Sequence, residues 1–511
     1  MKETNTSARP SLGEGCVEVI SPSSTICVPD DAAPRESRCA GFSRTQRHWV
    51  VLLAALAAFV APLSVFIYIP IIDTLSEELH VSIEFINITI TSYLIVQGLV
   101  PALLSNIADH VGRRPVYLVS LFTFSVSCIG LALQRSYSEL LIFRMIQSAG
   151  TSNLLSLGAM VVSDIAPAHS RGRYMSAMLT GVNLGPVVGP FVGGIMDDEI
   201  GWHQSFWLLL AFGATCWTCL FFFLPETCQN TVNDSIEMER KVSWPVSSAL
   251  VPDNKAVAAP DTQALVPSTH AFLNPFRELK IIFRRLDALI LAGNALVHLS
   301  FTCIQDSLAH LAMEKYKLNG LQAGLCYVPY GLAVFISAYA VGKIIDHDYT
   351  AVARSHGISI SDFVGHNFAS FPIERARLRT VWYLFPLLIA STVFYGWAVE
   401  YKINLALIMI TQFICCLAST GISNTCLTLY MDLHPRNPGV ASIAMNLVRS
   451  LAAAAGVAVV QLLVEEFGTG WTFTAYGATC LASVPMLLAV RAWGPTWREA
   501  VSRMGSGHRG Y

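Results

Sequence analysis

Twelve apolar segments, each about as long as a helix needs to cross a hydrocarbon core, constrain this chain more than any other feature. Six come before a polar stretch at 225–280, and six come after it. Only 13% of the 511 residues are charged, whereas about 25% is usual in soluble proteins. Because only helices and closed barrels satisfy their backbone polar groups in lipid, the pattern predicts an all-helical membrane protein. The segments lie near 49–71, 86–105, 116–134, 140–163, 174–196, 204–224, 286–309, 321–345, 380–399, 403–431, 438–463 and 470–491.

The spacing of these segments also predicts how the chain is divided. Two six-helix bundles are expected at 47–224 and 284–492, joined by a cytosolic linker at 225–283. The linker is rich in Pro, Ser, Ala and Val, and its end alternates between apolar and basic residues, as a short amphipathic helix on a membrane surface would. Residues 1–46 and 493–511 are expected to be cytosolic tails, the first of them disordered.

Basic residues are unevenly shared among the short connections, which predicts the orientation of the chain. With the N-terminus in the cytosol, the cytosolic connections carry Arg113, Arg114, Arg171, Arg173, Lys343 and Arg436. The opposite connections carry mainly acidic residues, namely Asp73, Glu77, Glu78, Asp197, Asp198, Glu199, Glu465 and Glu466. We therefore expect both termini in the cytosol, most simply at the plasma membrane. The sequons at Asn5, Asn87 and Asn233 are then not expected to carry glycans.

Composition makes several other classes of protein poor candidates. A net charge of −2 gives no reason to expect a nucleic-acid partner. The 13 cysteines show neither metal-ligand nor disulfide spacing, so no metal and no cofactor are expected. The sequence contains no Gly-x-x-x-x-Gly-Lys-Ser/Thr loop, which disfavours an ATP-driven pump. It also has no cluster of His or carboxylate residues of the kind that membrane enzymes use, so an enzyme is not expected.

The connection between the second and third segments reads Ser105-Asn-Ile-Ala-Asp109-His-Val-Gly112-Arg113-Arg114-Pro115. It resembles the signature of the major facilitator superfamily at this place, with Ser105 standing where the family usually has Gly and His110 where it has a cation. The resemblance implies that Asp109 and Arg113, with Gly112 and Arg114, form a latch against the opposite half that holds the outward-open state. The alternative is a solvated turn whose charges only set the topology.

Arg144 lies inside the fourth apolar segment, in the sequence Arg144-Met-Ile-Gln147-Ser-Ala-Gly. A guanidinium in a membrane is costly unless it faces a polar cavity or a partner, so it is a functional candidate by default. The stretch resembles the family pattern Arg-x-x-Gln-Gly-x-Gly, and Arg144 and Gln147 are candidates for proton coupling or for lining the cavity. The alternative is that Arg144 extends its side chain to the outer surface.

The fifth segment is rich in glycine and proline. Glycines at every fourth position let two backbones approach closely, and prolines remove backbone donors and permit bending. The pattern resembles a family signature associated especially with proton-coupled exporters. The residues expected to serve in helix contact or bending are Gly185, Pro186, Gly189, Pro190, Gly193 and Gly194. Contact between helices alone is the simpler reading.

The second half adds polar residues at membrane depth. Arg449 lies near the middle of the eleventh segment, with Asn446 one turn earlier on the same helix face. Either Arg449 lines a central cavity or it belongs to a buried ion pair. His298 could titrate near neutral pH and couple to protons, although a lone His is more often a core residue. Asn183 and Asn294 are further candidates for contact with cargo.

Across residues 45–500 the chain resembles the fungal drug:proton antiporters with twelve spans, including the quinidine-resistance and citrate or itaconate exporter branch. The resemblance implies a monomeric carrier of two pseudo-symmetric bundles that works by alternating access. It predicts proton-driven export of a small organic molecule, such as a secondary metabolite, a xenobiotic or an organic acid. Two buried arginines without a central carboxylate favour an anionic or neutral polar cargo. Uptake of an organic anion or nutrient and a transport-dead sensor are the alternatives.

Overall fold

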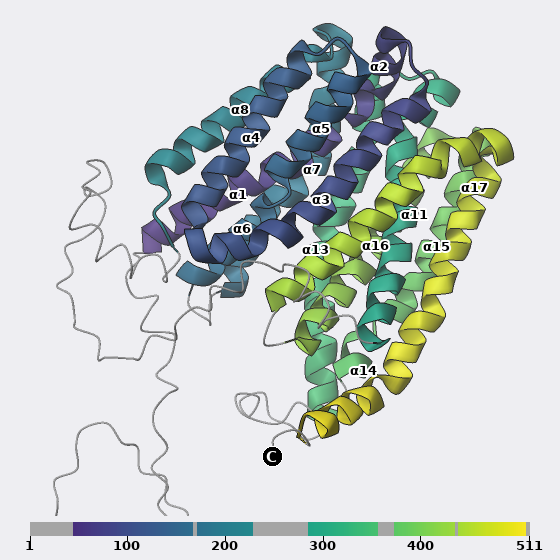
Figure 1. The fold of residues 1–511 in the computed structure, drawn as a ribbon. Helices are drawn as coiled ribbons and strands as arrows, with labels where there is room; N and C mark the ends of the chain where they lie inside the picture. Colours follow the sequence, from purple (N-terminus) through teal and green to yellow (C-terminus); the bar gives the residue numbers. More distant parts are fainter. Residues whose placement is uncertain (1–43, 167–170, 228–284, 356–372, 435–437, 507–511) are drawn as a thin grey trace, which may run out of the picture.

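The computed structural model describes residues 44–166, 171–227, 285–355, 373–434 and 438–506, and within these ranges the chain is helical with no strand. The first half forms a layer of long, tilted helices (Figure 1). Apart from residues 225–227, the predicted linker with its amphipathic segment lies outside the described residues, like most of the N-terminal tail. The elements of the first half are α1 (Arg44–Phe66), η2 (Ile69–Ile71), α2 (Ile72–Leu79), α3 (Ile83–Val111), α4 (Arg113–Leu133), α5 (Tyr137–Thr151), α6 (Leu154–Ile165), α7 (Arg171–Glu199) and α8 (His203–Phe223).

The second half repeats this design with its own long helices (Figure 1). Its last element is continuous over 69 residues except at Gly468, whose φ of 80° breaks it into two antiparallel limbs. The elements are α11 (Arg285–Tyr316), α12 (Gly320–Leu325), α13 (Val328–Ser355), α14 (Ile373–Arg377), α15 (Val381–Glu400), α16 (Leu405–Leu433) and α17 (Pro438–Ser506).

Ten stretches of the described chain are long and apolar enough to cross a membrane. One of them, Val440–Arg498, contains the break at Gly468 and is therefore two crossings. The fourth apolar segment is not among the ten because it is split between α5 and α6, neither of which is long enough alone. The second crossing of α17 adds one span, and α5 and α6 together add another, which brings ten to twelve within the described residues. The predicted all-helical fold with twelve spans is therefore confirmed.

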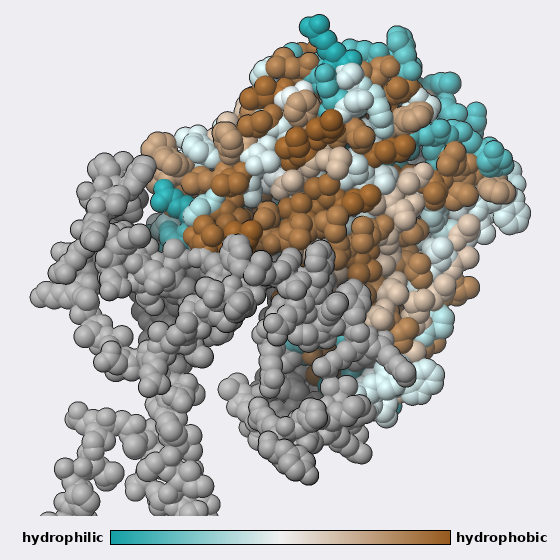
Figure 2. Space-filling view, viewed as in Figure 1, coloured by the Kyte–Doolittle hydropathy of each residue, from teal (hydrophilic) through white to brown (hydrophobic). Residues whose placement is uncertain are grey.

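The surface agrees with a lipid environment. Figure 2 shows brown, apolar residues over the helices of the first half and hydrophilic residues gathered at one end of the molecule. On α4, for example, Val119 is 66% exposed, Phe122 60% and Leu133 63%. Apolar side chains exposed in this number would be unstable in water, whereas a lipid solvent accommodates them. This chain is therefore embedded in a membrane.

The two halves touch at one end of the molecule, which we call the Asp73 end. There Asp73 of α2 pairs with His310 of α11, and Asp198 of α7 accepts hydrogen bonds from the backbone N–H groups of Gly320 and Leu321 at the start of α12. Away from this end the ribbons of the halves diverge (Figure 1). We call the opposite end, where α3 meets α4, the Arg113 end.

The glycines of α7 explain how closely the first half is packed. A Cβ added at Gly185 or Gly189 would lie 2.5 Å from Pro62 Cβ or 2.6 Å from Phe66 Cβ of α1, and one at Gly193 would strike the carbonyl oxygen of Ile67. The next residue, Gly194, faces the other half instead, where its Cβ would strike the carbonyl of Gly320. Pro186 and Pro190 lie inside α7, which continues through both.

The connection at 105–115 differs from the turn that its polar sequence predicts. Helix α3 continues to Val111 and α4 begins at Arg113, so Gly112 alone makes the turn, with a φ of 107°. The charged residues before Gly112 therefore belong to the last turns of α3. Hydropathy marks where a segment leaves the hydrocarbon, and a helix extends beyond that point when its backbone bonds continue.

Candidate functional site

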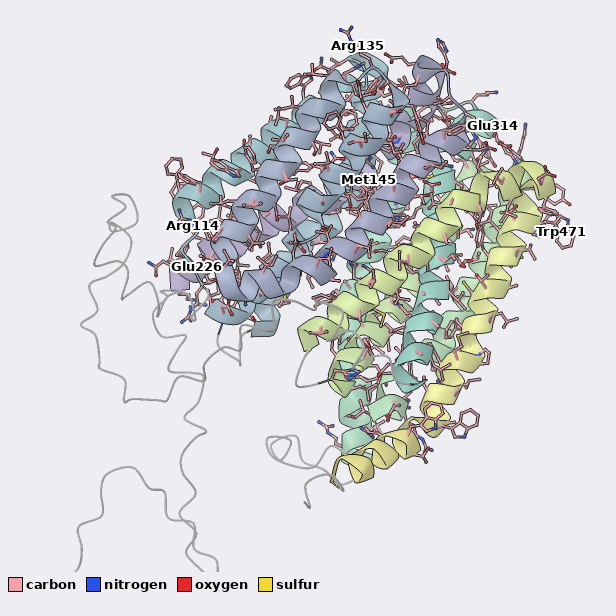
Figure 3. The ribbon with its side chains drawn as sticks, in the orientation of Figure 1. Arg114, Arg135, Met145, Glu226, Glu314 and Trp471 are labelled. Carbon is pink, nitrogen blue, oxygen red and sulfur yellow. The ribbon has the colours of Figure 1, made fainter. Side chains whose placement is uncertain are left out.

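A carboxylate from the end of the first half holds the tight turn at Gly112. Glu226 accepts hydrogen bonds from the backbone N–H groups of Arg113 (2.8 Å) and Arg114 (3.1 Å), at the start of α4, where the helix itself supplies no acceptor. The guanidinium of Arg113 pairs with Asp164 of α6 at 3.4 Å. Arg114 and Glu226 lie together at this end in Figure 3. These residues join α4, α6 and the end of α8 at the Arg113 end.

Replacing Gly112 by alanine is expected to loosen this cluster. The positive φ is unfavourable for an L-residue, and the added Cβ would lie 2.6 Å from Oε2 of Glu226. We expect a loss of stability of about 1–3 kcal/mol, the usual cost of strain or overpacking. A thermal-shift assay in detergent measures the loss, with Gly342→Ala as control because a Cβ there meets open space. Equal melting temperatures for Gly112→Ala and wild type would contradict this account of the turn.

Arg144 on α5 is 1% exposed and lies in a cage of aromatic rings. Its guanidinium carbon is 4.0 Å from the ring centroid of Tyr68 and 4.6 Å from that of Tyr93. One terminal nitrogen donates to Oε1 of Gln147 at 2.6 Å and to the carbonyl of Ser64 at 3.3 Å. Cation–π contacts of this kind are stronger when they are desolvated. The cage places a full positive charge inside the first half.

This charge is not neutralised by an acid among the described residues, since no carboxylate there forms an ion pair with Arg144. Its Nε is also buried without a hydrogen-bond partner in that part of the chain. The ring hydroxyls around it are already engaged: Tyr68 with Thr89 at 2.8 Å and Tyr93 with Thr151 at 2.8 Å. A buried cation with a free donor is an unusual and costly arrangement unless an anion or an acceptor visits it.

The second arginine lies where the halves meet. Arg449 on α17 donates to Oδ1 of Asn446 at 3.0 Å, and the amide of Asn446 donates to the carbonyl of Gln97 on α3 at 3.3 Å. Nε of Arg449 is buried without a partner among the described residues, and no carboxylate there pairs with its guanidinium. Arg449 of the second half is thus connected to the first half through the side-chain amide of Asn446.

Aromatic rings close the interface beside Arg449 on the side of the Asp73 end. Phe66 of α1 contacts Tyr330 of α13 with centroids 5.6 Å apart, Tyr330 stacks on Phe301 of α11 at 5.7 Å, and Phe301 contacts His298 at 5.8 Å. His298 and Tyr330 both interact electrostatically with Arg449. His298 therefore lies beside the Arg449 centre rather than beside Arg144.

The remaining cargo candidates are not all at this centre. Asn294 is buried within the second half, where its amide donates to the sulfur of Met445 at 3.1 Å and its carbonyl oxygen has no partner among the described residues. Asn183 is half-buried on α7, next to the glycines that face α1. Of Asp109, the structure describes only the backbone, which lies in the last turns of α3.

Two ion pairs lie at the Arg113 end of the second half. Glu374 of α14 is fully buried and lies 3.5 Å from Arg498 near the end of α17. Arg377 pairs with Asp432 of α16 at 2.8 Å. Burial raises the pKa of Glu374, against the opposing effect of Arg498. These contacts fasten α14 to two helix ends, as Glu226 and Asp164 do in the first half.

Two residues of these centres were not singled out from the sequence. Tyr68 surrounds Arg144 together with Tyr93, and Asp164 pairs with Arg113. Tyrosines are frequent in membrane helices, so nothing local marks Tyr68. Asp164 had a detectable signal, because it is an acid at the end of an apolar segment.

Comparison with known proteins agrees with this geometry. The family profile described as Major Facilitator Superfamily matches residues 54–457. The chain is 32% identical over 487 residues to MFS-type transporter R5 of a Phoma species, covering 94% of this chain and 92% of that one. It is 30% identical over 468 residues to Citrate exporter 1 of Aspergillus niger, covering 90% and 88%.

A solved structure has the same fold. The human organic anion transporter MFSD10 (TETRAN) superposes with a TM-score of 0.57 at 19% identity, covering 86% of this chain and 99% of that one. The family profile covers most of the length of the chain, and the tilted helices in two halves agree with it. The chain therefore belongs to the Major Facilitator Superfamily, a family of membrane transporters, and is a multi-pass membrane protein.

Proposed function

We propose that this protein exports a small organic anion or organic acid by alternating access, driven by protons that move inward. The observation that carries the proposal is a pair of guanidinium groups, on the buried Arg144 and the half-buried Arg449, neither of which has a carboxylate partner among the described residues. Arg449 lies between the halves, where a carrier of this fold binds cargo. Excess positive charge there favours an anion.

The proposed orientation in the membrane follows from the uneven distribution of basic residues. With Arg113 and Arg114 in the cytosol, the Arg113 end is the inner end, the Asp73 end is the outer end, and the present conformation faces inward. Asn87 supports the absence of a glycan there, because it is buried on α3. We take 47–224 and 284–492 as the two moving bodies, with the termini in the cytosol and the plasma membrane as the location. We also take the working unit to be a monomer.

The proposed latch fits this conformation. Arg113 pairs with Asp164 inside its own half while the outer end is closed. We infer that Asp109, Gly112, Arg113 and Arg114 engage the opposite half only when the inner end closes. The proposal places Gln147 with Arg144, and Asn183, Asn294, His298 and Asn446 with the cargo path.

The relatives support this direction and cargo class. Their names include a citrate exporter and an organic anion transporter, and the sequence resembles the fungal drug:proton antiporters, so efflux of a secondary metabolite is the favoured form. Uptake of a nutrient anion is the second candidate, because the same fold works in either direction. No described group of three or more His, Cys, Asp or Glu could hold a metal ion, and we propose a carrier rather than an enzyme.

A comparison of cells with and without the gene tests this function. Mass spectrometry of intracellular metabolites is expected to find small acids retained in the deletion strain and released again when the wild-type gene is returned. Arg449→Gln is expected to fail to release them, whereas Arg135→Gln, which changes an exposed arginine at the outer end, should succeed. Retention of cations only, or full release by Arg449→Gln, would contradict the proposal.

A further inference from the structure

A histidine at the outer end holds carboxylates from both halves. Nδ1 of His310 on α11 lies 2.8 Å from Oδ1 of Asp73 on α2, and its Nε2 lies 3.6 Å from Oε2 of Glu314, one turn later on α11. The side chains of His310 and Asp73 are 16% and 25% exposed. The imidazole is therefore shielded from bulk water while it connects the first half to the second.

The charged groups around this imidazole are acidic. On α11, Asp306 is buried one turn before His310 and interacts with it electrostatically. On α7, Asp197 accepts a hydrogen bond from Thr74 at 2.8 Å and interacts with Asp73 and with Asp198. The next basic residue along α11, Lys315, pairs instead with Glu400 of α15 at 3.5 Å.

The chemistry of imidazole makes this contact depend on protons. A protonated histidine donates from both ring nitrogens, whereas the neutral ring donates from one and presents a lone pair with the other. Two carboxylates on opposite sides of the ring are both satisfied only by the charged form. The unperturbed imidazole titrates near pH 6.5, within the range that separates an acidic exterior from a neutral cytosol.

The second contact across the outer end, between Asp198 and the start of α12, does not depend on a titratable donor. Asp198 accepts from the backbone N–H of Gly320 at 3.1 Å and of Leu321 at 2.9 Å, and these donors keep their protons at any physiological pH. The pair His310–Asp73 is thus the part of the closure that can respond to external acid.

We propose that His310, with Asp73 and Glu314, is a proton-binding site that closes the outer end. The inference rests on the proposed orientation and proton antiport. A proton taken from the exterior completes the contact between the halves and favours the inward-facing conformation. This is the return step that an antiporter makes without cargo. Loss of the proton weakens the contact and favours reopening to the outside.

Distances across the outer end test the site directly. Positions 135 and 471 lie at this end on opposite halves (Figure 3), and Trp471 is 64% exposed. Genetically encoded ketone residues at both positions carry spin labels without altering native cysteines. Pulsed electron resonance on the full chain in lipid nanodiscs then gives the closed and open populations. Between pH 8 and pH 5.5 we expect the closed-to-open ratio to rise at least about fivefold, the lower range of allosteric coupling.

His310→Asn should abolish this rise, and so should Asp73→Asn. The matched controls are His80→Asn and Glu77→Gln, both exposed near the outer end of α2. Exchanging the pair, Asp73→His with His310→Asp, is expected to restore the pH response. An unchanged response in His310→Asn, or an equal loss in His80→Asn, would overturn the site. Because no cargo is present, the result does not depend on whether anion export holds. If the closed population responded to pH as expected but no organic anion were exported, only the proposed function would be wrong.

Discussion

Replacing Arg144 by glutamine is expected to reduce transport by about 30-fold to several thousand-fold. This range corresponds to about 2–5 kcal/mol, the usual effect of removing one buried, hydrogen-bonded charge. Arg144 is caged by Tyr68 and Tyr93, and its charge has no carboxylate partner among the described residues. The free-energy cost of burying this charge is therefore offset only by a role in the transport cycle. Efflux from preloaded cells, normalised to the protein in the membrane, measures the loss.

The melting temperature of the variants distinguishes a functional role of Arg144 from a structural one. An uncompensated buried charge destabilises a fold, so Arg144→Gln should melt at the same temperature as wild type or higher. Arg144→Lys keeps the charge but not the planar group that stacks on two rings, and it should transport at an intermediate rate. Arg135→Gln is the control because this arginine is exposed at the Asp73 end. If Arg144→Gln melted several degrees lower and transported normally once folded, Arg144 would be a structural residue.

Gly324→Val is expected to stop transport by holding the Asp73 end open. A Cβ at Gly324 on α12 would strike the carbonyl oxygen of Pro190 on α7, in the other half. Backbone atoms at this contact cannot yield as a flexible side chain can, so closure of the Asp73 end becomes less favourable by about 1–3 kcal/mol or more. Spin labels at positions 135 and 471 should then report the longer separation as the major population, at every pH.

The neighbouring helix supplies a matched control. Gly342 lies on α13, and a Cβ added there meets nothing within 4 Å. Gly342→Val should therefore keep both the closed population and the transport rate of wild type. Normal transport by Gly324→Val would mean that the halves do not need this close approach, and the description of the closure at the Asp73 end would be wrong.

Much of the fold could be predicted from hydropathy, because lipid imposes length and apolar composition on every span. The sequence could not reveal that Gly112 alone separates α3 from α4, or that the fourth segment is split into α5 and α6. Breaks of this kind depend on hydrogen bonds from distant residues. The first backbone N–H groups of α4, for example, donate to Glu226, more than a hundred positions away.

The candidate site could be predicted only in part, for a related reason. Arg144 and Arg449 stand out because a charge in an apolar segment is rare. Most of their surroundings do not stand out, since Tyr68 and Tyr330 come from other helices and no local pattern marks them. The pair Asp73–His310 joins residues of opposite halves and depends on which end of the carrier is closed. A single sequence specifies both conformations of a carrier, so it cannot reveal which contacts belong to each.

Proton movement during transport tests the central claim most directly. Purified protein is reconstituted into liposomes with a trapped pH-sensitive dye and loaded with the metabolite that accumulates in gene-deleted cells. When this anion flows out, protons should flow in, and the lumen should acidify at a rate that falls with Arg144→Gln but not with Arg135→Gln. Outflow of the anion without acidification, or with protons leaving beside it, would contradict proton-driven export.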